Sequence, residues 1–379
     1  TPSPMQSIIL LALLTLIVQG CHMGSRMTAS LFAIELGANP FLLGVLIAVY
    51  SLFPLLLAVF TGRLCDRYGS RYPMLYGVAV FGLGLLLPYA WPSLVMLYAS
   101  AALIGVGFVL FNVAAQNLAG GLGPPEQRTR NFSTMGLGYA AGHMLGPLVA
   151  GYAIDTRGHA FAYLCFALLA LLPVAMLARN RSLNVAPHAA THDRGSAFGL
   201  LRNAGLRRAI ITSGLVVTGM DLYTFYVPIY GHAINLSAST IGAILGMFAA
   251  ASMVVRIVLP AVTRRYGVEA VLSTSMFAAA VFFLPFPFIT FVPALFALSF
   301  GIGLALGCGQ PLTLNLAYNR SPPGRSGEVT GLRLTINNLT HISVPLAAGV
   351  LGAMFGVAPV FWASAALLVT SGVLSRDNN

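Results

Sequence analysis

The chain has 379 residues, and its composition is 58% hydrophobic but only 8% charged, with a formal net charge of +11. Soluble globular chains carry roughly 25% charged residues, so this composition excludes an ordinary soluble domain. Apolar segments of about 18 to 25 residues, the length that a helix needs to cross a bilayer, recur along the whole chain. These segments lack the alternation of a membrane β-barrel. The sequence therefore predicts an all-α, multi-pass membrane protein.

Twelve transmembrane helices are expected, with short connections in all places but one. Residues 179–207 are polar and lack apolar periodicity, which predicts a cytoplasmic linker between two six-helix bundles, residues 1–178 and 208–379. The first span has no basic leader and no small-residue cleavage pattern, so we interpret it as a retained helix rather than a signal peptide. The expected spans are 7–35, 41–62, 72–91, 94–119, 130–154, 159–178, 208–233, 239–262, 268–289, 291–317, 328–355 and 358–375.

All basic side chains are arginines, and their placement argues against a nucleic-acid partner. Sixteen of them lie in or beside the loops after even-numbered spans or at the C-terminus, whereas only Arg157 lies in a loop after an odd-numbered span. This asymmetry predicts that both termini are cytoplasmic and that the protein resides in the cytoplasmic (inner) membrane. The four cysteines have neither pairing nor metal-type spacing, so no disulfide framework, zinc site or cofactor is expected.

A charged turn at residues 62–71 returns in weaker form at residues 260–269, an offset of 198 residues. The same offset holds over several spans without a gap, which a shared bias towards glycine and alanine does not explain. The chain is therefore expected to contain two related halves. Further matched pairs are Gly44 with Gly242, Gly105 with Gly303, Asn112 with Gln310, His143 with His341, Pro147 with Pro345, and Gly151 with Gly349.

The pattern Gly62-x-Leu64-x-Asp66-Arg67-x-Gly69-x-Arg71 resembles the signature loop between helices 2 and 3 of the major facilitator superfamily. The arrangement of the expected spans extends this resemblance to the whole chain. It implies two parallel-related six-helix bundles, a substrate site at the midplane between them, alternating access and a monomer. The chain departs from the family pattern in the fourth span, where Ala101 takes the place of the usual arginine.

A second motif, in the fifth span, is similar to one characteristic of the family's antiporters: Gly142, Gly146, Pro147 and Gly151. Small residues at four-residue spacing permit close helix packing, and the proline permits a kink. The alternatives are generic tight packing and a role specific to antiport.

The resemblance also implies a gate, in which the loop aspartate bridges the first half to the start of the eleventh helix. Asp66 is expected to act in this way, as an anion near a helix N-terminus. The alternative is a solvated, charge-balanced turn that only fixes topology. The gating candidates are Gly62, Asp66, Arg67, Gly69, Arg71, Arg256 and Arg333.

Four charged residues fall inside expected spans: Arg26, Asp221, Arg256 and Arg333. Each costs at least ~2.5–3.5 kcal/mol at depth, so such residues usually face a cavity or a partner. The resemblance implies that helices 1, 4, 7 and 10 line the cavity, so Arg26 and Asp221 are the leading pocket candidates. The alternative is that these two residues form an ion pair with each other. The surplus of arginine favours an anionic or zwitterionic substrate.

Asp221 is the only carboxylate expected deep in the membrane, which makes it the candidate proton-binding residue. His22 and His143 are further proton-coupling candidates, and His341, the repeat mate of His143, is a substrate-binding candidate. A second explanation for His143 and His341 is that they are packing residues at equivalent positions of the repeat. A third is that the three histidines and Asp221 bind a transition metal, although the positive charge of Arg26 beside His22 opposes a bare cation.

Polar and aromatic residues expected at depth complete the candidate substrate pocket, and interhelical hydrogen bonding is the alternative for each of them. Together with Arg26, the substrate-binding candidates are Asn112, Gln116, Tyr223, Tyr226, Tyr230, Gln310, Asn315, Asn337 and His341.

These features predict a secondary transporter that moves a small organic anion or zwitterion, coupled to protons, and not an enzyme. The expected partners are the small-molecule substrate, the proton and the lipid bilayer. The first alternative is a proton-driven exporter of amphipathic drugs or natural products, including metallophores, and the second is a transition-metal transporter. No nucleotide-binding motif occurs, which disfavours ATP-driven transport. A sensor would need an output domain and an enzyme a nucleophile–base pair, and the sequence suggests neither.

Overall fold

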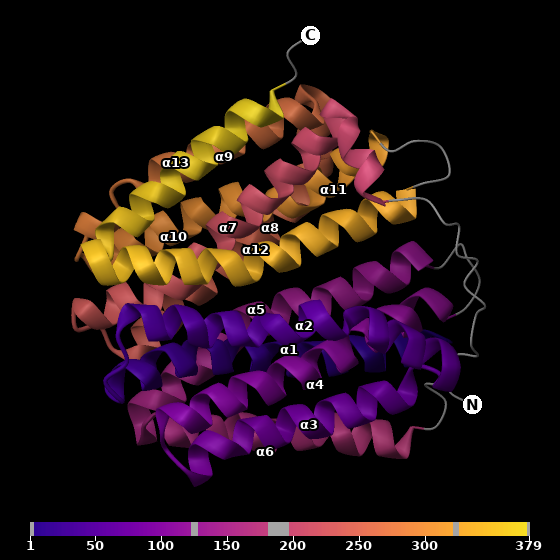
Figure 1. Cartoon of the computed structure of the whole chain (residues 1–379), viewed down its shortest axis with the longest axis vertical. Coiled ribbons are helices and arrows are strands. Elements are labelled where there is room, and N and C mark those ends of the chain that lie inside the picture. Colours follow the sequence, from indigo (N-terminus) through magenta and orange to yellow (C-terminus); the bar gives the residue numbers. More distant parts are fainter. Residues whose placement is uncertain (1–3, 123–127, 181–196, 321–325, 377–379) are drawn as a thin grey trace. The chain divides into compact units, whose positions relative to one another are not determined.

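The computed structural model describes residues 4–122, 128–180, 197–320 and 326–376, and these residues form helices and short connections without any strand (Figure 1). The first half contains six helices. They are α1 (Pro4–Glu35), α2 (Pro40–Tyr68), α3 (Arg71–Ala90), α4 (Leu94–Gly121), α5 (Arg128–Arg157) and α6 (His159–Arg179). Side-chain caps begin some helices; for example, Ser93 accepts a hydrogen bond from the Met96 amide at the start of α4.

The second half begins with a 3₁₀-helix, η2 (Ala197–Arg202), at the end of the expected linker; residues 181–196 of that linker lie outside the described part of the chain. The expected helical architecture is therefore confirmed. The remaining elements are α7 (Ala204–Ala233), α8 (Ala238–Tyr266), α9 (Val268–Phe283), η3 (Phe286–Phe288), α10 (Val292–Gly307), α11 (Gly309–Asn319), α12 (Ser326–Phe355) and α13 (Ala358–Ser375).

The expected tenth span is not one continuous helix, because it breaks at Cys308 between α10 and α11. Pro311 explains the break: it has no amide hydrogen to donate to the carbonyl group of Gly307, and its ring obstructs that carbonyl. Taken together as residues 292–317, these two helices are still long and apolar enough to cross a membrane. Eleven described segments meet that standard; α5 does not, because it is richer in polar residues.

The internal repeat extends to the backbone conformation. Among the described residues, six have a positive φ angle, and they form three pairs at the offset of 198 residues. The pairs are Gly37 (φ 83°) with Asn235 (φ 59°), Gly69 (78°) with Gly267 (82°), and Gly158 (85°) with Gly356 (82°). Each pair ends equivalent helices, so the two halves share their turns as well as their apolar runs.

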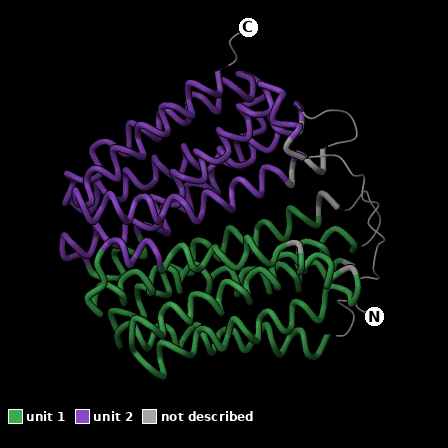
Figure 2. The backbone as a smooth tube through the Cα atoms, viewed as in Figure 1, with its two compact units in different colours: residues 1–39, 46–192, 237–243 green, residues 40–45, 193–236, 244–379 purple. Residues whose placement is uncertain are grey.

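The chain divides into two compact units (Figure 2). Unit 1 contains residues 1–39, 46–192 and 237–243, and unit 2 contains residues 40–45, 193–236 and 244–379. The first residues of α8 thus belong to unit 1, where the Asp155 carboxylate accepts hydrogen bonds from the amides of Ala238 (2.9 Å) and Ser239 (2.8 Å). Burial raises the pKa of Asp155, but the hydrogen bonds from Ser239 and Ala238 outweigh this effect and lower the pKa below its usual value.

Within unit 1, glycines of α5 lie directly against the backbone of α1. A Cβ atom added at Gly146 would lie 2.3 Å from the carbonyl oxygen of Gly20, and one added at Gly142 would lie 2.7 Å from that of Leu16. Gly151 meets the start of α8 in the same way, 2.3 Å from the carbonyl oxygen of Ala238. The fifth-span glycines therefore set the distance between α5 and its neighbours.

We predict that Gly146→Ala destabilises the protein by about 1–3 kcal/mol, because the methyl group would push α5 away from α1. SDS-induced unfolding in mixed micelles measures this loss. Gly136→Ala is the matched control on the same helix, since a Cβ atom there would meet nothing within 4 Å. Equal stability of the two variants would contradict the packing interpretation.

Candidate functional site

Unit 2 holds a buried carboxylate in contact with a histidine. Asp221 lies on α7 and is only 5% exposed. His341, on α12, places Nδ1 2.5 Å from the carboxylate oxygen Oδ2 of Asp221, so the ring N–H donates to the carboxylate. About a third of the His341 side chain (34%) is exposed, which connects the buried acid to the surface of the unit. The structure thus joins the proton-binding candidate to a residue that the sequence assigned to the substrate.

A second polar cluster of unit 2 surrounds Arg333, which is 6% exposed. Its Nη1 atom donates to Ser213 Oγ and to Gln310 Oε1, both at 3.0 Å. Ser213 in turn donates to Asn337 Oδ1 at 3.2 Å. The break between α10 and α11 lies next to Gln310 and helps to place its side chain beside α12.

The two clusters form one polar seam between α7 and α12. Arg333, Asn337 and His341 follow at four-residue intervals, so they share one face of α12. Ser213 and Asp221 contribute from α7 and are two turns apart. We refer to these five residues, together with Gln310, as the α7–α12 seam. It carries one anion, one permanent cation and one titratable histidine.

Unit 1 contains a polar cluster in which no charged side chain takes part in the described hydrogen bonds. Asn112 on α4 accepts hydrogen bonds from the hydroxyl group of Tyr139 (2.6 Å) and from Gln116 Nε2 (2.9 Å). One turn along α5 from Tyr139, Nδ1 of His143 lies 3.1 Å from Gln19 Nε2 on α1. Gln19 and Tyr139 were not predicted, although a glutamine inside an apolar run and a tyrosine one turn before His143 were available signals.

The repeat makes the two units directly comparable. His143 and His341 are equivalent positions, but the first contacts an amide and the second a carboxylate. At the same offset, the positions of Asp221 and Arg333 in the first half are Met23 and Met135. The two charges of the α7–α12 seam are therefore not shared with the first half.

The predicted residues of the first span have different surroundings. Arg26 is half-buried, and its guanidinium forms no hydrogen bond or ion pair with the described residues. His22 is buried and stacks on Phe108, with ring centroids 4.0 Å apart, and its predicted part in proton coupling stays a prediction. Within unit 2, Asp221 takes His341 as its ion-pair partner.

The three tyrosines of α7 form hydrogen bonds inside unit 2. Tyr223 donates to Ser299 Oγ at 2.6 Å, Tyr230 to the carbonyl oxygen of Ile289 at 2.9 Å, and Tyr226 to the carbonyl oxygen of Ala348. All three are less than 9% exposed. These contacts correspond to the alternative of interhelical hydrogen bonding. Asn315, by contrast, is exposed and accepts a hydrogen bond from Asn319.

The residues predicted to form the gate lie in different local environments. Arg71 caps the end of α6 by donating to the carbonyl oxygens of Leu177 (3.2 Å) and Ala178 (3.0 Å). Arg67 lies over the ring of Tyr68, and Arg256 is exposed. Gly69 makes the left-handed turn, and Gly62 has open space around it. The side chain of Asp66 lies outside the described part of the structure, so its predicted contact stays a prediction.

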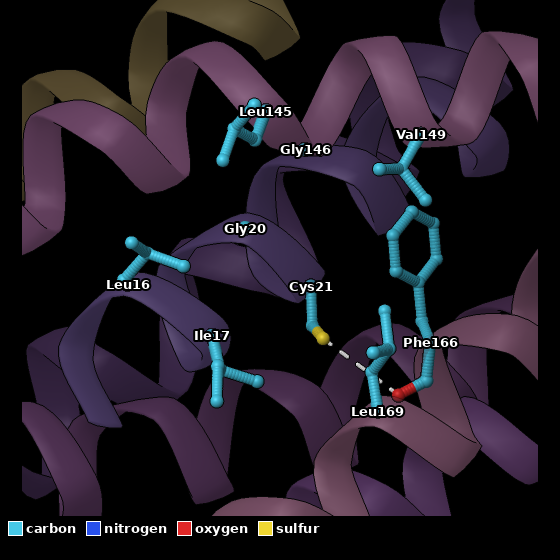
Figure 3. A pocket seen from close by; sticks show the side chains of 9 residues that line it. All are labelled: Leu16, Ile17, Gly20, Cys21, Leu145, Gly146, Val149, Phe166 and Leu169. Carbon is cyan, nitrogen blue, oxygen red and sulfur yellow. Dashed lines mark hydrogen bonds between the residues drawn. The ribbon is translucent and has the colours of Figure 1, made fainter. Parts of the chain in front are cut away.

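An apolar cavity of about 190 Å³ lies in unit 1 between α1, α5 and α6 (Figure 3). It contains none of the predicted substrate-binding residues, and its apolar walls offer nothing to a charged group. Among the described residues, no three histidine, cysteine or acidic side chains are grouped as a metal site would require. The cavity is lined by Leu16, Ile17, Gly20, Cys21, Leu145, Gly146, Val149, Phe166 and Leu169.

Comparison with known proteins gives consistent results. Residues 11–344 match the model of the Major Facilitator Superfamily. The class H tetracycline resistance protein of Pasteurella multocida is 23% identical over 315 residues, which cover 80% of this chain and 77% of the relative. The multidrug resistance protein MdtG of Dickeya zeae (strain Ech586) is 25% identical over 346 residues, 88% of this chain and 83% of the relative.

Solved structures show the same fold. The peptide transporter POT, in complex with sulfate, superimposes with a TM-score of 0.80 at 14% identity and covers 98% of this chain and 93% of its own. The nucleoside transporter NupG superimposes with a TM-score of 0.76 at 15% identity and covers 97% and 98%. At these identities the likeness concerns the fold alone.

We predict that Asp221 and His341 are energetically coupled, because removal of either one leaves the other without its partner in a buried site. In SDS-induced unfolding, Asp221→Asn and His341→Gln combined should cost less than the sum of the single variants, by about 1–3 kcal/mol. His143→Gln combined with Asp221→Asn is the control pair and should be additive. Additive behaviour of both pairs would contradict the coupling.

Proposed function

Because the chain belongs to the major facilitator superfamily, we propose that it is a proton-coupled secondary transporter that exports small amphipathic organic molecules across the cytoplasmic membrane. The observation that carries the proposal is the contact between Asp221 and His341. In the proposed orientation both termini are cytoplasmic, as the arginine distribution predicts.

The pair suits reversible proton binding because a buried acid lies against a histidine ring that is about a third exposed. When Asp221 holds a proton, its side chain is a neutral acid, which suits a buried site. When the proton leaves through the exposed side of His341, Asp221 carries a negative charge at a site that is 5% exposed, which is costly. The two protonation states therefore stabilise different conformations, and a proton gradient can drive the exchange between them.

The two relatives described above favour export of amphipathic molecules over uptake. One is named for resistance to tetracycline and the other for resistance to multiple drugs. The Asn112 cluster of unit 1 offers hydrogen bonds to such a molecule, and Arg26 offers a positive charge. The described residues contain no grouped metal ligands, and the proposal accordingly leaves out the transport of bare metal ions.

We expect Asp221→Asn to abolish proton-coupled transport while leaving exchange of substrate for substrate in place, because the amide keeps the shape of the carboxylate but binds no proton. Everted membrane vesicles that are acidified inside and loaded with acridine orange report proton release when tetracycline or ethidium is added. Labelled substrate exchanged at equal pH reports the second activity.

Glu35→Gln is the matched control, because Glu35 is an exposed carboxylate that pairs with His159 at the end of α1. It should release protons like the unaltered protein. Undiminished proton release by Asp221→Asn would remove Asp221 from the coupling role. Substrate accumulation in right-side-out vesicles instead of everted ones would favour uptake over export.

A further inference from the structure

We propose that Arg333 binds an oxyanion of the transported molecule, such as a carboxylate, sulfonate or phosphonate group, through one free edge of its guanidinium. This inference rests on the proposed transport function, and it assigns to the α7–α12 seam a ligand contact in addition to proton binding. It also gives Arg333 a role different from the gating role that the sequence suggested.

The hydrogen bonds of Arg333 leave one edge of its planar guanidinium group without a partner among the described residues. Both donated bonds leave from Nη1, one to Ser213 and one to Gln310. The Nε atom is buried and has no hydrogen-bond partner, and Nη2 donates to none of the described residues. Nε and Nη2 lie on the same edge of the guanidinium plane and point in the same direction, as two oxygens of one acid group require.

The charge of Arg333 is also unmatched within the described residues. The four carboxylates whose side chains the structure describes are all engaged elsewhere: Glu35 with His159, Glu269 with Arg320, Asp221 with His341, and Asp155 with the start of α8. The neighbours of Arg333 are a hydroxyl group and two amides. Among the described side chains, the guanidinium of Arg333, which is only 6% exposed, therefore has no carboxylate to balance its positive charge.

A buried cation without a counterion is costly, and an anionic ligand is the partner that would remove the cost. The planar fork favours acid groups with two oxygens in one plane over a halide or an amide. The position also suits a substrate, because Arg333 lies eight residues before His341, about 12 Å along α12 at 1.5 Å per residue. An amphipathic acid can thus be held at Arg333 without occupying the proton-binding pair.

The closed edge has a further consequence. Nε is enclosed in this conformation, so the acid group must enter in a conformation in which that edge opens to the seam. Gln310 is the neighbour placed to move, since it follows the break between α10 and α11 and is half-exposed. Arg333 would then keep its bond to Ser213 while the acid takes the free edge.

The test uses the full-length protein in detergent and three probes that share one apolar body: 2-naphthoate, 2-naphthamide and 2-naphthylmethylammonium. Binding is measured by the shift of the thermal unfolding midpoint and by calorimetric titration. The unaltered protein should bind the naphthoate about tenfold or more tightly than the naphthamide, because a charge-assisted pair replaces a neutral contact. Absence of this preference overturns the proposal without any variant being needed.

Arg333→Gln should remove the preference for the acid while leaving naphthamide binding unchanged, and Arg333→Lys should restore only part of it, because an ammonium lacks the fork. Arg157→Gln, which removes an exposed arginine, is the control and should keep the full preference. Equal weakening of naphthoate and naphthamide by Arg333→Gln would overturn the binding role and favour gating. These readouts measure binding alone, so they remain decisive even if Asp221→Asn leaves proton coupling intact.

Discussion

An ionised carboxylate inside a membrane-spanning bundle needs a partner, and the identity of the partner decides what the site can do. An arginine would hold Asp221 in a permanent ion pair. His341 instead shares a hydrogen bond with the carboxylate and carries no permanent charge, so the charge balance of the pair changes when a proton arrives or leaves. The need to neutralise a buried acid is thereby converted into sensitivity to the proton concentration on either side of the membrane.

The scaffold around this pair is closely packed. Glycines such as Gly142 and Gly146 fix the spacing of α5 and α1 at backbone contact, and the tyrosines of α7 are tied into unit 2 by hydrogen bonds. The two halves repeat their helices and their left-handed turns, yet only the second carries charge at the seam. The two halves thus share a framework, and Asp221 and Arg333 stand at positions that are methionine in the first half.

The sequence was sufficient for the helices and the repeat, because span length and offset matches do not depend on side-chain orientation. It was less informative about partners. Segments that are apolar on every side give no preferred face, so the rotation of each helix, and with it the meeting of Asp221 with His341, was not predictable. The hydrogen-bond partners of the α7 tyrosines depend on the same rotation and were equally out of reach. Pro311 did signal the break beside Gln310, but the high apolarity of that span concealed it.

The central claim is that Asp221 gains and loses the transported proton. Infrared difference spectroscopy of the protein in lipid, recorded while the pH is stepped and while substrate is added, observes the carboxylic acid directly. The account predicts an acid carbonyl band that changes with both pH and substrate and is missing from Asp221→Asn. A band that is insensitive to substrate, or that persists in that variant, would contradict the account.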